Sequence, residues 1–260
     1  MSINLKRKDQ KYEYGLVLSG GGTRGVAHLG VIKALEESGI KPDIISGVSA
    51  GSIVGALYAD GKNPEEIFEA ITSHKMFSFL EFTIPKTGLI KMSGFEKTLK
   101  KLLKAENFEE LNIPLNIFAV NMNTGEYTCF DSGPLAVVVK ASSSIPIVFP
   151  PVEINGELYT DGGLINNFPL EALEGKCKRI IGVSVNPLGI KRKLDSLKII
   201  AERTFQLNIR SHTLDRKNRC DLFIEPEGLD DYSLIDLSGA EEMFKMGYKT
   251  AKKLIKEKGW

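Results

Sequence analysis

Cysteine, histidine and long apolar runs are scarce in this chain of 260 residues. The three cysteines are an odd number without a CxxC pair, which argues against a disulfide framework or a cysteine zinc site and fits a reducing compartment. No run approaches the roughly 18 apolar residues of a membrane-spanning helix, and the first 20 residues lack the apolar core of a secretory signal. These absences predict a cytoplasmic protein.

A surplus of charge of one sign is also missing. The 34 lysines and arginines are matched by 33 aspartates and glutamates, so the formal net charge is +1. Dedicated nucleic-acid-binding domains usually have a clear basic surplus. We therefore expect no nucleic-acid partner, and nothing in the composition specifies an oligomeric state.

Short apolar segments alternate with helical patterns along most of the chain. An Asn-Pro-Glu-Glu start at 63–66 and a capping-box spacing at 93–96 mark two of the helices. This alternation predicts one α/β domain over residues 1–260, with three layers in which helices cover both faces of a mainly parallel central sheet. Strands are expected at 14–19, 43–47, 115–122, 126–130, 152–154, 158–160, 179–185 and 222–225, and helices at 26–35, 49–59, from 63, from 93, at 194–214 and at 240–255.

A glycine-rich loop, Gly20–Gly25 (GGGTRG), lies between the first expected strand and the first helix. It matches the G-x-G-x-x-G fingerprint of dinucleotide-binding proteins. That fingerprint also needs an acidic residue at the carboxyl end of the second strand, whereas Asp43 precedes that strand. Consecutive glycines beside a helix N-terminus can instead present backbone N–H groups to a developing negative charge, as an oxyanion hole does. A plain tight turn is the third interpretation.

The segment Gly47–Gly51 (GVSAG) is a G-x-S-x-G motif between the second expected strand and the second helix. In this context the motif forms a sharp turn that holds its serine in a strained backbone and exposes the hydroxyl. Glycine is expected to be required at positions 47 and 51, because a Cβ at either position would collide with the neighbouring strand or helix. Ser49 is therefore predicted to be a nucleophile, and the alternative is a serine that only caps the helix.

A serine nucleophile needs a base, and the chain has only three histidines. His28 falls inside the first expected helix and is best explained as a core residue. His74 ends the third helix, where a cation is favourable. A Ser–Asp–His triad in hydrolase order would need His212, which lies in a charged helical stretch and not on a loop after a strand.

Asp161 is the stronger candidate for the base. The segment Tyr159–Gly163 (YTDGG) ends an expected strand and enters a glycine turn, so the carboxylate projects where a partner can approach. An exposed aspartate has a pKa of about 3.9 and is a weak base, but burial beside an apolar wall would raise the pKa. Residues 145–151 (IPIVFPP) could form that wall. The alternative is an aspartate that only stabilises a loop as an Asx turn.

The three motifs Gly20–Gly25, Gly47–Gly51 and Asp161–Gly163 together resemble the patatin-like phospholipase family. The family pattern is a glycine-rich oxyanion loop, a G-x-S-x-G elbow and a D-G-[GA] motif, in that order. The segment 141–169 also resembles the stretch that leads into the family's aspartate, and the resemblance extends over about 14–185. Ser19 is a departure, because many plant members have aspartate there, and it leaves the partner of the loop open.

This resemblance implies acyl-ester hydrolysis by a Ser–Asp dyad that uses no histidine, no metal and no other cofactor. Ser49 would be the nucleophile and Asp161 the base. Arg24 would orient the glycine loop or contact a lipid headgroup. The other implied positions are Gly20, Gly21 and Gly22 as oxyanion donors, with Arg24, Gly25, Gly47, Gly51, Gly162 and Gly163 as supporting residues of the motifs.

A lipid acyl hydrolase acting on a lipid ester is the function that these residues predict. An acyltransferase that uses the same acyl-enzyme and a non-catalytic lipid-binding protein are the alternatives, and the intact Ser49 and Asp161 disfavour the second. The segment 76–82 (MFSFLEF) has five large apolar residues in seven. It either caps the core or forms a lip that meets a membrane surface, which would make the protein peripheral to a membrane.

Overall fold

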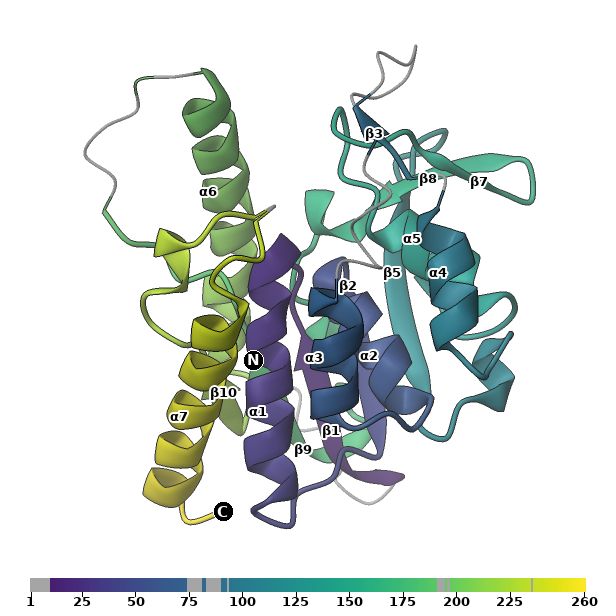
Figure 1. Ribbon diagram of the computed structural model, residues 1–260. Helices are drawn as coiled ribbons and strands as arrows, with labels where there is room; N and C mark the ends of the chain where they lie inside the picture. Colours follow the sequence, from purple (N-terminus) through teal and green to yellow (C-terminus); the bar gives the residue numbers. More distant parts are fainter. Residues whose placement is uncertain are drawn as a thin grey trace, which may run out of the picture.

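An eight-stranded sheet forms the centre of the molecule in the computed structural model (Figure 1). The structure describes residues 10–73, 81–82, 90–92, 94–190, 195, 197–234 and 236–260. The strand order is β10-β9-β1-β2-β5-β8-β7, and β6 also pairs with β5. The strands are β1 (Tyr12–Leu18), β2 (Ile44–Val48), β5 (Leu115–Asn121), β6 (Tyr127–Phe130), β7 (Val152–Ile154), β8 (Glu157–Asp161), β9 (Cys177–Val183) and β10 (Leu222–Ile224).

Parallel pairing dominates one half of the sheet. Strands β10, β9, β1, β2 and β5 pair parallel with one another in that order. Strands β6 and β8 pair antiparallel with β5, and β7 pairs antiparallel with β8. Every residue of β2 and β5 is buried, as expected for central strands that are covered on both faces. The predicted mainly parallel sheet is confirmed, and the loops that follow β1 and β2 meet at its carboxyl edge.

Helices pack against the near face of the sheet in Figure 1. Their apolar side chains join those of the strands in the main hydrophobic core. Helices α1 and α7 approach so closely that a Cβ on Gly247 would lie 2.1 Å from the backbone oxygen of Ala27. The helices on this side are α1 (Val26–Glu36), α2 (Ala50–Ala59), α3 (Pro64–Thr72) and α7 (Ala240–Lys258), with α4 (Phe95–Leu102) and α5 (Leu135–Ser142) near β5.

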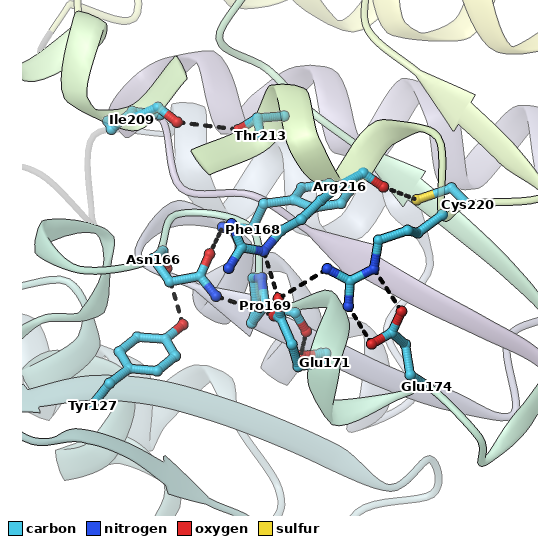
Figure 2. A network of polar contacts seen from close by, with 12 residues as sticks. Tyr127, Asn166, Phe168, Pro169, Glu171, Glu174, Ile209, Thr213, Arg216 and Cys220 are labelled. Carbon is cyan, nitrogen blue, oxygen red and sulfur yellow. Dashed lines mark hydrogen bonds and ion pairs between the residues drawn. The ribbon is translucent and has the colours of Figure 1, made fainter. Parts of the chain in front are cut away.

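The opposite face of the sheet is covered by the segment after β8 and by α6 (Leu197–Lys217). Phe168 of that segment packs against Val17 of β1. An ion pair of 2.6 Å between Arg216 and Glu171 joins α6 to the same segment (Figure 2). Helices therefore lie on both sides of the sheet, as predicted, although part of the second layer consists of turns.

One helix, α5, is not predicted by the sequence. It contains three consecutive valines, Val137 to Val139, and β-branched residues have only a weak preference for helix. Tertiary packing overrides that preference, because Leu135 and Val139 are completely buried. The helix matters for the site, since its carboxyl end leads into residues that contact the elbow.

The start of α3 follows the sequence prediction. Asn63 accepts the N–H of Glu66 at 2.8 Å, and the Glu66 carboxylate accepts the N–H of Asn63 at 2.9 Å, which completes a capping box. Helix α4 instead follows Gly94 without a side-chain cap, and Ser93, the expected cap, lies outside the described residues.

The apolar segment 76–82, expected either to cap the core or to form a lip, lies mostly outside the described residues. Its last two residues form β3 (Glu81–Phe82), which pairs with β4 (Ile90–Lys91) in a separate two-stranded sheet. His74 is also outside the described part of the chain. None of the helices that the structure describes is long and apolar enough to cross a bilayer.

Candidate active site

One edge of β5 brings two of the predicted motifs together. Strand β2 pairs with this edge as far as Val48, which lies opposite Phe118. Strand β6 occupies the other edge of β5 at the same level. Strand β8 must therefore pair with the edge of β5 that β2 also uses, and on that edge Asp161 lies opposite Ala119. Asp161 therefore takes the next position along the edge that β2 leaves, directly beside the turn that contains Ser49.

Ser49 lies in a strained turn between β2 and α2. Its backbone angles are φ 52° and ψ −124°, a combination that residues with a Cβ rarely adopt. Its N–H donates to the Ser142 hydroxyl at 2.9 Å, and that hydroxyl donates to the Phe118 carbonyl at 2.7 Å. The Ser49 side chain makes no capping bond to α2, so the interpretation as a helix cap is not supported.

The glycines of the elbow are required by close contacts with backbone. A Cβ on Gly47 would lie 2.6 Å from the carbonyl oxygen of Gly51, and a Cβ on Gly51 would lie 2.2 Å from that of Leu18. A Cβ on Gly25 would lie 2.7 Å from the Cβ of Ala50. Because backbone atoms cannot move aside cheaply, the predicted steric need for Gly47 and Gly51 is confirmed.

Asp161 is almost completely buried, with 1% of its surface exposed. Its N–H donates to the Ser144 carbonyl at 2.9 Å, and its Oδ1 accepts the N–H of Gly163 at 2.8 Å. Burial raises the pKa of the carboxyl from 3.8 to about 7, while interactions with the Ser49 hydroxyl and the Gly163 N–H oppose the rise. Within the described residues Oδ2 has no hydrogen bond of ordinary geometry, so the Ser49 contact is a loose one, as is common before substrate binds.

The surroundings of Asp161 differ from the apolar wall that was expected at 145–151. Ile147, in the middle of that segment, is 80% exposed and has a φ of 71°. The turn after Asp161 instead packs on the elbow, because a Cβ on Gly162 would lie 2.5 Å from the Phe118 oxygen and 2.8 Å from Val48 Cγ2. The prediction of the wall is therefore wrong at Ile147.

The glycine loop leaves β1 directly beside Ser49. A Cβ on Gly20 would lie 2.8 Å from the Cβ of Ser49. Among the contacts that the described residues make, none involves the backbone N–H of Gly20, Gly21 or Gly22. Free backbone donors beside a nucleophile are what an oxyanion hole needs. Ser19 supplies the partner that the sequence left open, since its hydroxyl donates to the Gly20 carbonyl at 3.0 Å.

Arg24 anchors the loop from its far side. Its side chain is 1% exposed, and Nε and Nη2 donate to the Tyr232 carbonyl at 2.9 and 2.6 Å. Thr23 adds a hydroxyl bond of 2.7 Å to the Ser233 carbonyl. The glycine loop is thus held by the segment 230–234, which lies far beyond the motifs. Such a buried guanidinium supports the loop-orienting role, and a headgroup contact is not available to it.

His28 is a buried core residue, as predicted. Its Nε2 lies 2.9 Å from the Ser19 carbonyl, and burial lowers the pKa of the ring to about 4. The ring is therefore neutral at pH 7 and donates its Nε2–H to that carbonyl. His212 lies inside α6, as predicted, and its side chain is outside the described atoms. No group of three or more metal-binding side chains occurs in the part of the chain that the structure describes.

The interpretation of the glycine loop as a dinucleotide site fails because no acidic residue lies at the carboxyl end of β2. Asp43 lies before β2, and its Oδ2 accepts the N–H groups of Glu13 and Tyr14 at 3.0 and 2.8 Å. It therefore stabilises the start of β1 at the amino edge of the sheet. The carboxyl end of β2 leads into the Ser49 elbow instead of an acidic residue.

Two hollows lie at opposite edges of the sheet. A cavity of about 480 Å³ is lined by residues that begin strands, among them Tyr12, Ile44 and Leu115. A small apolar hollow of about 20 Å³ lies between Gly22 and Ala50, next to Ser49. Ligands of open α/β sheets bind at the carboxyl ends of the strands. The smaller hollow lies at these ends and is therefore assigned to the candidate site, whereas the larger cavity lies at the amino ends.

The motifs agree with the comparison to protein families. The family model described as patatin-like phospholipase matches residues 16–174. The chain belongs to the patatin-like phospholipase family, as its sequence motifs predicted.

Two relatives show how far the similarity extends. The chain is 27% identical to Lysophospholipase NTE1 of Debaryomyces hansenii over 286 residues, which covers 97% of this chain and 18% of that protein. It is 32% identical to an NTE family protein of Mycobacterium tuberculosis over 174 residues, which covers 66% of this chain and 48% of that protein. The chain therefore matches less than half the length of either relative.

Solved structures share the same architecture. VipD from Legionella pneumophila superposes with a TM-score of 0.57 at 16% identity, covering 95% of this chain and 67% of that chain. ExoU from Pseudomonas aeruginosa, solved with SpcU, gives a TM-score of 0.52 at 15% identity, covering 96% and 53%. At such low identities the likeness shows the fold, an α/β domain with a central sheet.

Proposed function

We propose that this protein is a serine hydrolase of lipid acyl esters, of the phospholipase A, lysophospholipase or esterase type. The observation that carries the proposal is the meeting of a strained Ser49 and a buried Asp161 at neighbouring positions along β5. The N–H groups of the glycine loop lie beside them and make no hydrogen bond to any residue that the structure describes. Membership of the patatin-like phospholipase family and the lysophospholipase among its relatives support a lipid ester as the substrate.

The first half-reaction forms an acyl-enzyme. Asp161 takes the proton of the Ser49 hydroxyl while Oγ attacks the ester carbonyl, and a carboxyl whose pKa is about 7 is a far better base than an exposed aspartate. The N–H groups of Gly20, Gly21 and Gly22 donate to the oxyanion, and one such donor is worth roughly 100–1000-fold in rate. The carbon–oxygen bond to the leaving alcohol then breaks, and that alcohol takes the proton from Asp161.

The second half-reaction releases the fatty acid. Asp161 takes a proton from a water molecule, whose oxygen attacks the acyl carbon of the acyl-enzyme. Collapse of the second tetrahedral intermediate breaks the bond to Ser49 Oγ and returns the proton to it. No step in this scheme needs a histidine or a metal, and an alcohol acceptor in place of water would make the same protein an acyltransferase.

The acyl chain is proposed to start from the apolar hollow beside the elbow. Val26, Ala50 and Ile53 line it together with Ile71. Its volume of about 20 Å³ matches roughly one water-sized group, so it seats only the carbons nearest the ester. The rest of the chain then extends toward a lipid surface, which would make the protein peripheral to a membrane of a reducing compartment such as the cytoplasm.

The apolar segment 76–82 is proposed as the contact with that surface, because five of its seven residues are large and apolar. Serine at Phe77 and Phe79 should slow hydrolysis of aggregated lipid and leave hydrolysis of a short soluble ester and the melting temperature unchanged. A fall of several degrees in melting temperature with equal losses on both substrates would show that these residues belong to the core.

The proposed dyad is tested by three variants on one soluble ester. We expect Ser49→Ala to abolish turnover and Asp161→Asn to lower it by at least about 1000-fold, with His212→Ala close to wild type. Asp131→Asn is the matched control, since this aspartate is exposed. A large loss with His212→Ala and a small one with Asp161→Asn would replace the dyad with a triad, and substantial activity of folded Ser49→Ala would overturn the assignment.

A further inference from the structure

We propose that Asn167 and Asn186 are positioning residues that aim the Gly21 N–H at the oxyanion. The inference rests on the proposed function, since it assigns both side chains a part in that same site. Neither asparagine belongs to the three sequence motifs, and Asn186 lies beyond residues 16–174 that the family model matches.

Both asparagines donate to one backbone carbonyl at the foot of the glycine loop. They are buried, with 1% and 4% of their surfaces exposed. The Nδ2 atoms of Asn167 and Asn186 lie 3.2 and 2.6 Å from the carbonyl oxygen of Gly20. The Ser19 hydroxyl is a third donor at 3.0 Å. A carbonyl oxygen has two lone pairs, so three donors fix its direction firmly.

The direction of this carbonyl sets the direction of the next amide. The Gly20 carbonyl and the Gly21 N–H belong to one trans peptide unit, in which the two groups point in opposite directions. A carbonyl held by the asparagines therefore turns the Gly21 N–H away from them. Glycine backbone is otherwise free to rotate, and a flipped peptide would present an oxygen, which repels an oxyanion.

Asn167 also fills the space between the oxyanion loop and the turn of the base. Its Oδ1 would lie 2.4 Å from a Cβ on Gly20 and 2.6 Å from a Cβ on Gly163. The segment that bears it is held from outside, because the Tyr127 hydroxyl donates to the Asn166 carbonyl at 2.9 Å (Figure 2). The same side chain thus touches both halves of the proposed catalytic apparatus.

Within the described structure, the side chain of Asn186 makes hydrogen bonds only through its Nδ2 donor group. Its Oδ1 is buried and has no hydrogen-bond partner in the described structure. An unsatisfied buried acceptor is costly, and a leucine of similar size would avoid that cost. The position therefore favours a residue that is needed for its N–H groups, which point to Gly20.

The test replaces each asparagine with leucine, which keeps the volume and removes the donor. We expect Asn167→Leu and Asn186→Leu to lower kcat by about tenfold each and about 100-fold together, with KM nearly unchanged. The rate ratio of a soluble ester to its thionoester should fall as well, because sulfur is a weak acceptor and gains little from the oxyanion hole. Asn116→Leu is the matched control, since Asn116 is equally buried and contacts the Ile45 carbonyl at the start of β2.

A second measurement reads the loop without any turnover. Amide hydrogen exchange in the peptide 18–25 should be faster in the double variant than in wild type, and unchanged in Asn116→Leu. Wild-type kcat and an unchanged ester-to-thionoester ratio in the double variant would overturn the inference. If wild type hydrolyses no ester, the proposed function fails, and unchanged exchange at 18–25 would then overturn the positioning role separately. Should the double variant not fold, the single variants decide by the same measurements.

Discussion

Asp161 combines two effects of burial that act in opposite directions. A pKa of about 7 makes the carboxyl a useful base near neutral pH. The same desolvation penalises the folded state, because the unfolded chain ionises this group at its ordinary pKa of 3.8. The folded protein therefore binds more protons than the unfolded chain between these two values, and the contribution of Asp161 to stability falls as the pH rises through that window.

This linkage predicts that Asp161→Asn stabilises the protein while it abolishes catalysis. At pH 8 the variant should exceed wild type in free energy of unfolding by a few kcal/mol, with an upper limit of about 4 kcal/mol. The difference should shrink toward pH 4, where Asp161 in the folded protein is protonated and therefore as neutral as the asparagine of the variant. Urea unfolding of both proteins at several pH values measures it, and Asp131→Asn should show no such trend. Equal stability of Asp161→Asn and wild type at pH 8 would contradict the raised pKa.

Single residues differ in how well the sequence predicts their place in the site. Ser49 and its flanking glycines could be predicted because their steric need appears locally, at fixed spacing after a strand. Ser142, Asn167 and Asn186 could not, since each acts on residues that are distant in sequence. The contact between Ser142 and Ser49 spans 93 residues, and the contacts of Asn167 and Asn186 with Gly20 span 147 and 166. No local pattern marks an asparagine that will donate to a remote carbonyl.

The glycine loop, the proposed source of the oxyanion donors, is held by a segment that follows it by about 210 residues. Segment 230–234 accepts hydrogen bonds from Thr23 and Arg24, and a Cβ on Gly22 would lie 2.2 Å from the Leu234 oxygen. The site therefore depends on a segment outside the family-matched residues 16–174. A change in the position of this segment would move the proposed oxyanion donors.

We predict that Arg24→Lys lowers kcat by about tenfold and the melting temperature by several degrees. A single ammonium cannot reproduce the geometry of the Nε and Nη2 donors of arginine. Steady-state kinetics on a soluble ester and thermal unfolding measure the two effects. Arg219→Lys is the control, because this arginine is 41% exposed in a surface ion pair and such pairs contribute little. Wild-type kcat in Arg24→Lys would show that the loop is held without the guanidinium.

Most elements could be predicted because their signals are local. The Asn63 capping box and the apolar runs of the inner strands appear directly in the sequence, and the structure confirms them. Helix α5 was missed because valines favour strands when taken alone, whereas burial against β5 decides their conformation here. The wall expected at 145–151 is wrong at Ile147 because an apolar residue can remain exposed, which a sequence pattern does not reveal.

At the scale of the whole molecule, the sheet separates the chemistry from the larger cavity. The proposed site lies at the carboxyl edge, and the cavity of about 480 Å³ lies at the amino edge. The balanced charge of +1 offers no long-range attraction to nucleic acid or to an anionic surface. The surface contact proposed for the apolar segment 76–82 does not depend on such an attraction.

The central claim is that Ser49 is a nucleophile activated by Asp161. Labelling with a fluorophosphonate, followed by intact-mass measurement and peptide mapping, tests it most directly. Wild type should gain one phosphonyl group, located on Ser49, at a rate that rises with pH around a midpoint near 7. Labelling should be absent in Ser49→Ala, strongly slowed in Asp161→Asn and unchanged in His212→Ala. A folded wild-type protein that gains no mass, or that labels at the same rate without Asp161, would contradict the account.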